Sequence, residues 1–411
     1  MAIIAKILET QNHMKRVLYS AVMSLVLFVT GCSDSNQYNS SLPQIDMNAE
    51  YPEKEICLQD VAEVSYISLE TTDDFLLTDV ASMEMVSSKG IVCVSDEKVL
   101  LFYPDGKVRS LLNRKGEGPG EYRYVHYATV DWEREEIYIH DIHQKTMLVY
   151  SFDGNFKHQF DIDIRARQHD LLCDNDGHIV LYKERPGRMQ HGMIEPPYRP
   201  VVLMSKADGK IDSLLHQQDY YTTMFVKAKL ANGGDWTLDV SIQALVKLNN
   251  EVYVNEVASD TIYQLKGADL EPFVSRTPSI KDNESGKYFL QLKGITPNHY
   301  YFHLQTKELS GGSTSGMTIR LADENSKNAM FDTRTGKVFC PKFINRDYTS
   351  EFSYDGLTFD GCDANTAYMV FEAFDLIEAL EAGELRGNLK NIAEGLKEDD
   401  NPVLMIVKFK E

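Results

Sequence analysis

The chain has few basic residues and none of the short motifs of the common hydrolases. Its 411 residues include 42 Lys and Arg against 62 Asp and Glu, a net charge of −20. A surface this acidic repels nucleic-acid phosphates and anionic lipid surfaces, so no nucleic-acid partner is expected. Gly-x-Ser-x-Gly, His-Glu-x-x-His and a Cys-His nucleophile context are all missing, so no familiar hydrolase or zinc-peptidase site is predicted.

Cysteine and histidine do not have the spacing of a metal module. His140 and His143 are three residues apart at the end of a predicted strand, so their side chains point to opposite faces. His299 and His303 share a face, and we expect them to be packed or solvated. No metal site and no cofactor is predicted. Apart from the lipidation candidate described next, we expect buried thiols and leave disulfide pairing open for Cys57, Cys93, Cys173, Cys340 and Cys362.

The only long apolar run lies near the N-terminus. Lys15-Arg16 precedes 13 uncharged, largely apolar residues from Val17 to Val29, too few to span a membrane comfortably as a mature helix. Residues 1–31 therefore read as a signal peptide, for which Met14 is an alternative start. Cys32 follows Thr30-Gly31 in a sequence that resembles a bacterial lipobox, so we expect Cys32 to be lipidated.

The residues after Cys32 are polar and rich in Ser and Asn. Residues 32–46 are predicted to form a flexible tether, and residues 47–411 the folded domain. A lipid on Cys32 would place the protein in the bacterial cell envelope, with the outer membrane as the expected site and the leaflet left open.

A phrase of two short apolar strands and a turn that ends in Gly recurs along the chain. Copies occupy residues 87–106, 133–154, 174–209, 248–267 and 296–336. Each is preceded by a further strand, predicted at Ala81–Val86, Tyr127–Trp132, His169–Cys173, Ile242–Leu248 and Tyr288–Leu292. A repeated four-strand unit of about 40–50 residues is typical of a β-propeller. The predicted fold class is therefore all-β.

The rest of the chain supplies a sixth blade. Leu357–Phe359, Thr366–Phe371 and Pro402–Phe409 are its first three predicted strands. Apolar residues near a period of 3.6 predict a helical insertion between them, at Phe374–Leu396. The fourth strand is missing at the C-terminus, and we expect the N-terminal segment Glu63–Leu69 to close the ring and remove its open edge.

Several segments together resemble a known group of proteins. They are VSYISLET at residues 64–71, RKGEGPGEY from Arg114 to Tyr122, the Asp-Gly blade turns, and DNPVLMIVKF at residues 400–409. With these, residues 47–411 resemble the six-bladed β-propeller lipoproteins of gut anaerobes, which are related to NHL-repeat propellers. The resemblance implies a fold and an envelope location, because the activity of that family is largely unassigned.

The candidate ligand-binding residues lie in loops predicted to open on one face. RKGEGPGEY is followed by a strand and lacks Gly-Lys-Ser/Thr, so it is predicted to link two blades or bind a ligand, not to form a phosphate loop. Two long loops, at residues 184–200 and 306–327, share its face with the loop at 141–145. The candidates are Arg114, Glu121, Tyr122, Asp141, His143, Arg185, Arg188 and Tyr198.

These patterns favour a non-catalytic envelope lipoprotein that binds a ligand, such as a glycan, or a protein partner on the long-loop face. Two alternatives stay open. One is a glycan hydrolase or lyase with its site at the central channel, since carboxylates are abundant. The other is a structural subunit of an outer-membrane uptake complex. No catalytic residue can be named from the sequence.

Overall fold

The computed structural model describes residues 42–77, 83–95, 97–125, 127–164, 166–174, 176–183, 199–215, 225–229, 235–239, 242–256, 259–279, 288–307, 309–310, 320–321, 325–349 and 357–411. The predicted signal peptide, Cys32 and residues 32–41 of the predicted tether lie outside this part. Most of the two long loops does as well.

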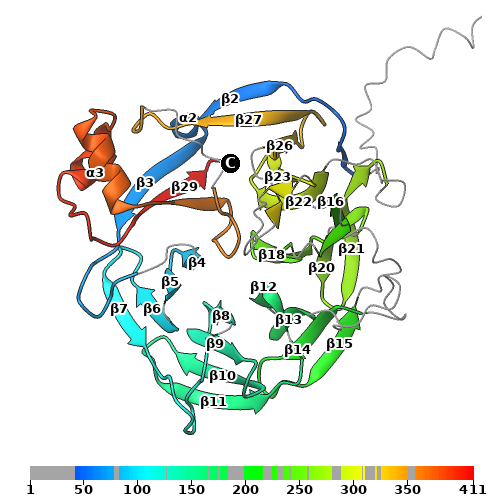
Figure 1. The fold of residues 1–411 in the computed structure, drawn as a ribbon, viewed down its shortest axis with the longest axis vertical. Helices are drawn as coiled ribbons and strands as arrows, with labels where there is room; N and C mark the ends of the chain where they lie inside the picture. Colours follow the sequence, from blue (N-terminus) through cyan, green and yellow to red (C-terminus); the bar gives the residue numbers. More distant parts are fainter. Residues whose placement is uncertain are drawn as a thin grey trace, which may run out of the picture. The chain divides into compact units, whose positions relative to one another are not determined.

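Six sheets of three to five strands are arranged around a common centre, as expected for a six-bladed propeller (Figure 1). From the centre outward, the first sheet contains β4 (Met83–Ser87), β5 (Gly90–Ser95), β6 (Lys98–Phe102) and β7 (Val108–Leu112). The second contains β8 (Tyr127–Asp131), β9 (Glu136–Asp141), β10 (Thr146–Ser151) and β11 (Phe156–Asp161). The third contains β12 (Ala166–Cys173), β13 (His178–Lys183), β14 (Val201–Ser205) and β15 (Ile211–Leu215).

The fourth and fifth sheets each carry an additional outer strand. From the centre outward, the fourth sheet contains β18 (Leu245–Leu248), β19 (Glu251–Val254), β20 (Thr261–Lys266) and β21 (Asp269–Thr277), and its additional outer strand is β1 (Gln44–Asp46). The fifth sheet contains β22 (Tyr288–Ile295), β23 (His299–Thr306), β26 (Lys327–Asp332) and β27 (Val338–Ile344), and its additional outer strand is β2 (Glu53–Cys57). Two hairpins lie outside these sheets and pair β16 (Phe225–Lys229) with β17 (Asp235–Asp239), and β24 (Leu309–Ser310) with β25 (Arg320–Leu321).

The two outermost strands come from the N-terminal segment. β1 pairs in parallel with β21, and β2 pairs in parallel with β27. Ile45 and Met47 are fully buried there. Gln44–Asp46 lies within the stretch predicted to be a tether, so the structure shortens that tether. Parallel pairing with strands more than 200 residues away left no local signal in the sequence.

The last sheet combines the two C-terminal strands with β3, a strand from the N-terminal part of the chain. β29 (Val403–Phe409) lies between β28 (Thr366–Phe371) and β3 (Ala62–Ser68) and pairs antiparallel with both. A bridge from Thr358 to Tyr368 places the segment at 357–359 on the inner side of β28. Two short helices, α3 (Ala373–Glu381) and α4 (Gly387–Ala393), lie between β28 and β29 in the chain, and α2 (Leu58–Val61) precedes β3.

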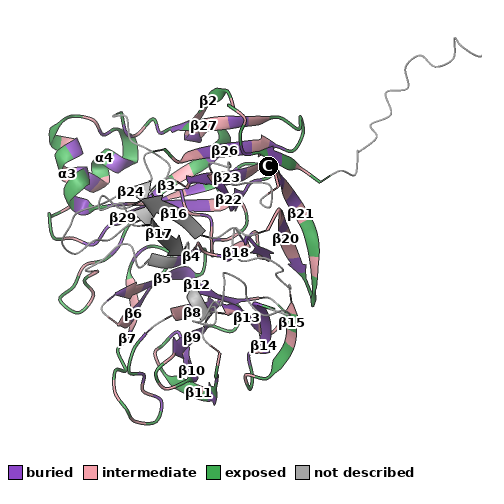
Figure 2. Ribbon diagram, turned by 45° about the vertical axis from the view of Figure 1, so that its right-hand side comes forward, coloured by how far each residue is buried: buried purple, intermediate pink, exposed green. Residues whose placement is uncertain are grey.

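The hydrophobic core lies between neighbouring sheets, because successive strand residues point to opposite faces. Along β9, Ile137 and Ile139 pack toward the first sheet, whereas Tyr138 packs toward the third. Figure 2 shows burial concentrated on the strands of the sheets. The seam between the last and first sheets is packed in the same way, by Leu404 with Leu100 and Phe102.

Aspartates at strand ends hold the tight turns of several blades. Asp131 Oδ1 accepts the backbone N–H groups of the residues two and three positions on, at 3.0 and 3.1 Å. Asp141 and Asp332 make the same pair of bonds in their own turns. Each turn then passes through a residue with positive φ, which is Glu135, Lys145 or Gly336. The repeated sequence phrase therefore encodes a repeated Asp-capped turn.

Candidate functional site

The link from Arg114 to Tyr122 is held by its own hydrogen bonds. Lys115 forms a bridge with Tyr122, and the Glu121 carboxylate accepts the Gly118 N–H at 2.8 Å. A Cβ on Gly116 would lie 2.0 Å from Glu121 Oε2, so the carboxylate occupies the space that the glycine leaves. Glu121, a predicted ligand residue, therefore stabilises the loop that carries it.

Tyr122 is also a structural residue. Its side chain is fully buried, and its hydroxyl donates to the carbonyls of Glu97 at 2.9 Å and Leu112 at 3.2 Å. The same hydroxyl accepts the Arg114 N–H at 3.1 Å. Burial raises the pKa of the Tyr122 phenol, which keeps it a hydrogen-bond donor. Its assignment to a ligand surface is corrected, because a ligand has no access to it.

The assignment of Asp141 to a ligand surface is also corrected, because a ligand cannot reach its side chain. It is fully buried, and besides capping its own turn it accepts the Arg123 N–H through Oδ2 at 2.7 Å. The predicted link and the predicted loop at 141–145 therefore do meet, through backbone-directed bonds. The rings of Tyr124 and His143 add an edge contact at 6.3 Å between centroids.

Arg114 and His143 are the exposed members of the predicted set. Neither lines the cavity described next. Arg185, Arg188 and Tyr198 lie outside the described residues. Of the predicted ligand residues that the structure describes, Arg114 and His143 are thus exposed and Glu121 is partly exposed.

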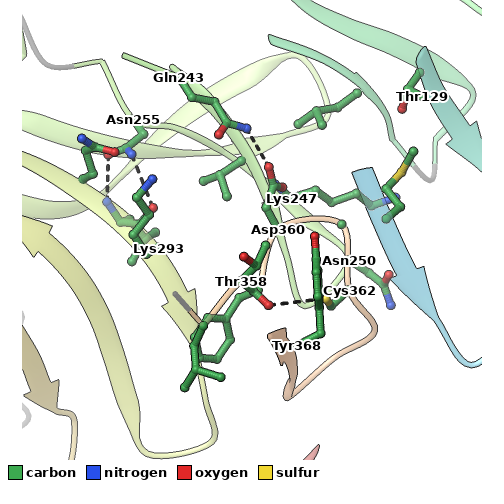
Figure 3. A pocket seen from close by; sticks show the side chains of 18 of the residues that line it. Thr129, Gln243, Lys247, Asn250, Asn255, Lys293, Thr358, Asp360, Cys362 and Tyr368 are labelled. Atoms are coloured by element: carbon green, nitrogen blue, oxygen red, sulfur yellow. Dashed lines mark hydrogen bonds between the residues drawn. The ribbon is translucent and has the colours of Figure 1, made fainter. Parts of the chain in front are cut away.

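A cavity of about 490 Å³ lies where the innermost strands of the sheets meet. This volume falls within the roughly 300–1,000 Å³ typical of small-ligand sites. β8, β12, β18, β22 and the segment at 357–363 all contribute side chains. The polar part of its wall is formed by Thr129, Gln243, Lys247, Asn250, Asn255, Gln291, Lys293, His303, Gln305, Asn328, Thr358, Asp360 and Asp363. Figure 3 shows several of them converging on the same space.

Lys293 is placed in this cavity by a β-bulge. In the pairing of β22 with β23 the register shifts between Leu292 and Gly294, which leaves Lys293 as the extra residue. A bulge changes the direction of the side chain that it carries and often occurs beside functional sites. A Cβ on Gly294 would lie 2.5 Å from the Phe359 ring, so the glycine lets the last sheet pack tightly against the bulge.

Lys293 is partly exposed and lies in the wall of the cavity. Burial lowers its pKa, and the nearby Asp360 carboxylate acts in the opposite direction. In the described part of the chain, no side chain or carbonyl forms a hydrogen bond or salt bridge with Lys293 Nζ. Its ammonium is therefore available to an acceptor that enters the cavity.

The turn at 360–365 belongs to the last sheet and forms hydrogen bonds with the fourth sheet. Asp360 accepts the Lys247 N–H at 2.7 Å and the Gln243 amide at 2.6 Å (Figure 3). The Gly361 N–H donates to the Lys247 carbonyl at 3.1 Å. Burial raises the pKa of the Asp360 carboxyl, although these hydrogen bonds oppose that shift.

Asp363, the other carboxylate of the cavity wall, is bound to the first sheet. It accepts the Ser87 hydroxyl at 2.8 Å and the Ser88 N–H at 2.6 Å. Lys247 contributes a second cation to the wall, but its Nζ already donates to the Cys173 carbonyl at 2.9 Å. Lys293 therefore differs from the other charged groups of the wall in having no such bond within the described residues.

Sequence reasoning did not single out Lys293 or Asp360. The signal for Lys293 was a charged residue next to Gly in an otherwise uncharged strand, YFLQLKGI. Among the described residues, His, Cys, Asp and Glu form no group of three that could hold a metal ion. The described helices are also too short or too polar to cross a membrane.

A family model described as "Domain of unknown function (DUF4934)" matches residues 42–408. The chain belongs to this family. The DUF4934 match spans all six sheets and the strands at the outer edges of the fourth and fifth. A comparison with curated proteins finds no match.

Solved structures share the fold of this DUF4934 member at low identity. A Bacteroides fragilis protein described as exported is 14% identical, with a TM-score of 0.62 over 90% of this chain and 100% of that one. A DUF4221 member from Bacteroides vulgatus is 9% identical, with a TM-score of 0.45 over 86% of this chain and 99% of that one. At this identity, the first likeness supports the fold alone.

Proposed function

We propose that this protein is an exported, lipid-anchored propeller that binds a small polar ligand in its central channel. The observation that carries the proposal is the cavity of about 490 Å³, with polar side chains from several innermost strands converging on it. Convergent polar groups in a preformed cavity are the usual signature of a ligand site.

The finer features of the proposal come from the sequence. A lipid on Cys32 attaches the protein to the bacterial envelope, at the outer membrane, as in the NHL-related lipoproteins it resembles. β3 closes the ring beside β29, and α3 and α4 form an insertion in the last blade. A glycan is the proposed ligand class, because amides, hydroxyls and aromatic rings in the wall suit sugar hydroxyls and C–H faces.

A binding role is favoured over catalysis by the state of the two wall carboxylates. A glycosidase pair needs one carboxyl group to protonate the leaving oxygen and another to act as base or nucleophile. Asp360 and Asp363 are instead each held by donors from a sheet other than their own. These contacts join blades, so we assign both carboxyl groups a structural role.

Channel binding is expected to change the fluorescence of Trp132, which lines the cavity. The chain has 2 tryptophans, so a Trp236→Phe background makes Trp132 the sole indole reporter. A panel of mono- and disaccharides should contain members that alter the Trp132 emission saturably. Thr358→Phe, which fills part of the cavity, should abolish that change.

Arg114→Ala with His143→Ala is the matched control on the predicted long-loop face. This variant should bind as the parent does. Loss of binding in it, with the Thr358→Phe variant unaffected, would move the ligand to the loops. If no saccharide binds and the chain instead co-purifies with another envelope protein, the structural-subunit alternative takes over.

A further inference from the structure

We propose that the channel selects a ligand that carries a carboxylate, and that Lys293 Nζ is the group that binds it. This inference rests on the proposed function and adds the ligand's charge to it. The chemical class is a small sugar acid, with one anionic group and several hydroxyls.

The first argument is the contrast between Lys293 and two other enclosed lysines. Lys206 Nζ donates to Asp131 Oδ2 at 2.8 Å and to the Asp174 carbonyl at 2.6 Å. Lys247 Nζ donates to the Cys173 carbonyl. Lys293, which is partly buried, has no such acceptor within the described residues. Because Lys293 is partly exposed at the cavity wall and has no protein acceptor among those residues, its ammonium can form a charge-assisted bond with an anionic group that enters the cavity.

The second argument is the state of the carboxylates near it. Asp360 accepts two hydrogen bonds and Asp363 accepts two more, so both carboxyl groups already have protein donors. A ligand carboxylate would give Lys293 a charge-assisted bond without disturbing these contacts. Such bonds are stronger than neutral ones in a low-dielectric site.

The third argument concerns charge at the scale of the whole molecule. With a net charge of −20, the protein surface repels anions in general. An acidic ligand would need a local cation to bind at all, and Lys293 supplies one at the wall of a channel. Thr129, Gln243 and Gln291 lie in the same wall and offer polar atoms for hydroxyl groups.

Galacturonate and galactose are the matched probes, because they differ in a carboxylate at one carbon. We expect the full chain to bind galacturonate more tightly than galactose by isothermal titration calorimetry. Lys293→Met should weaken galacturonate binding about 10- to 100-fold, the range of a lost hydrogen bond to a charged group. It should leave galactose binding within about twofold.

Two further variants separate charge from folding. Lys293→Arg keeps the cation and should retain the preference for the acid. Lys89→Met removes an exposed lysine that pairs with Glu133 and should change neither affinity. Circular dichroism melting of each variant checks that the fold is intact.

The outcomes distinguish this inference from the proposed function. Equal binding of both sugars, with both affected alike by Lys293→Met, overturns the inference while Trp132 still reports a channel ligand. If neither sugar changes Trp132 emission but other saccharides do, the inference also fails and the proposed function survives. If no saccharide changes the Trp132 emission, both this inference and the proposed function fail.

Discussion

Replacing Lys206 with methionine should lower the free energy of unfolding by about 3 kcal/mol, at the lower end of the ~3–5 kcal/mol measured for broken buried ion pairs. Lys206 is 2% exposed and bridges the second and third sheets through Asp131 and the Asp174 carbonyl. Its loss leaves the Asp131 carboxylate buried without its cation. The lower end applies because two backbone N–H groups and Arg134 still contact that carboxylate.

A double-mutant cycle isolates the energy of the charge interaction between Lys206 and Asp131. Asp131→Asn keeps the Oδ1 acceptor that caps the turn and removes the negative charge. Lys206→Met combined with Asp131→Asn should therefore be more stable than Lys206→Met alone. Urea unfolding followed by Trp132 fluorescence measures all four proteins. A loss under about 0.5 kcal/mol for Lys206→Met would mean that the pair is not buried in solution.

The contribution of the Lys206–Asp131 pair to the free energy of unfolding should decrease as the pH falls. Burial of the Asp131 carboxyl opposes ionisation, but the hydrogen bonds from Lys206 and the turn outweigh it, so its pKa is lowered. A lowered folded-state pKa gives stability that is present above the unfolded value of about 3.9. That stability is lost as the pH falls through the folded-state pKa. The gap between the parent and Lys206→Met should therefore narrow below about pH 4.

Gly106→Ala should destabilise the protein by about 2–5 kcal/mol, which combines a left-handed backbone penalty with overpacking. Gly106 has a φ of +82°, and a Cβ there would lie 2.3 Å from the Ser68 carbonyl oxygen in β3. Because this oxygen belongs to the backbone of a paired strand, it cannot move away as a side chain would. The clash falls at the seam between the last and first sheets.

Gly336→Ala is the matched control. Gly336 occupies a comparable turn at a φ of +67°, and a Cβ there would meet no described atom within 4 Å. Its cost should be limited to the backbone penalty of about 1–2 kcal/mol. Chemical denaturation of both variants gives the difference between them, which reports the contact of β3 with the first sheet. Equal costs would contradict a closed seam at this point.

Much of the strand arrangement could be predicted because its signals are local. A short apolar run such as Ile137, Tyr138 and Ile139, with an Asp or Gly at the following turn, indicates a hairpin from a dozen residues. β1 and β2 could not be predicted in the same way. They are short and largely polar, and their parallel partners lie more than 200 residues away.

The site was harder to predict because polar residues serve two purposes that look alike in a sequence. Asp141 and Tyr122 suggested a ligand surface, yet Asp141 caps its own turn and Tyr122 donates to the Glu97 and Leu112 carbonyls of the first sheet. Lys293 looked like one more lysine near a strand end. Its role depends on a one-residue bulge and on a turn from another sheet that brings Asp360 beside it.

The most direct test of the central claim is a crystal structure of the full chain soaked with galacturonate. We predict ligand density inside the channel, with its carboxylate within hydrogen-bond distance of Lys293 Nζ. Density on the long-loop face with an empty channel, or Lys293 paired with a protein carboxylate while the ligand lies elsewhere, would contradict it.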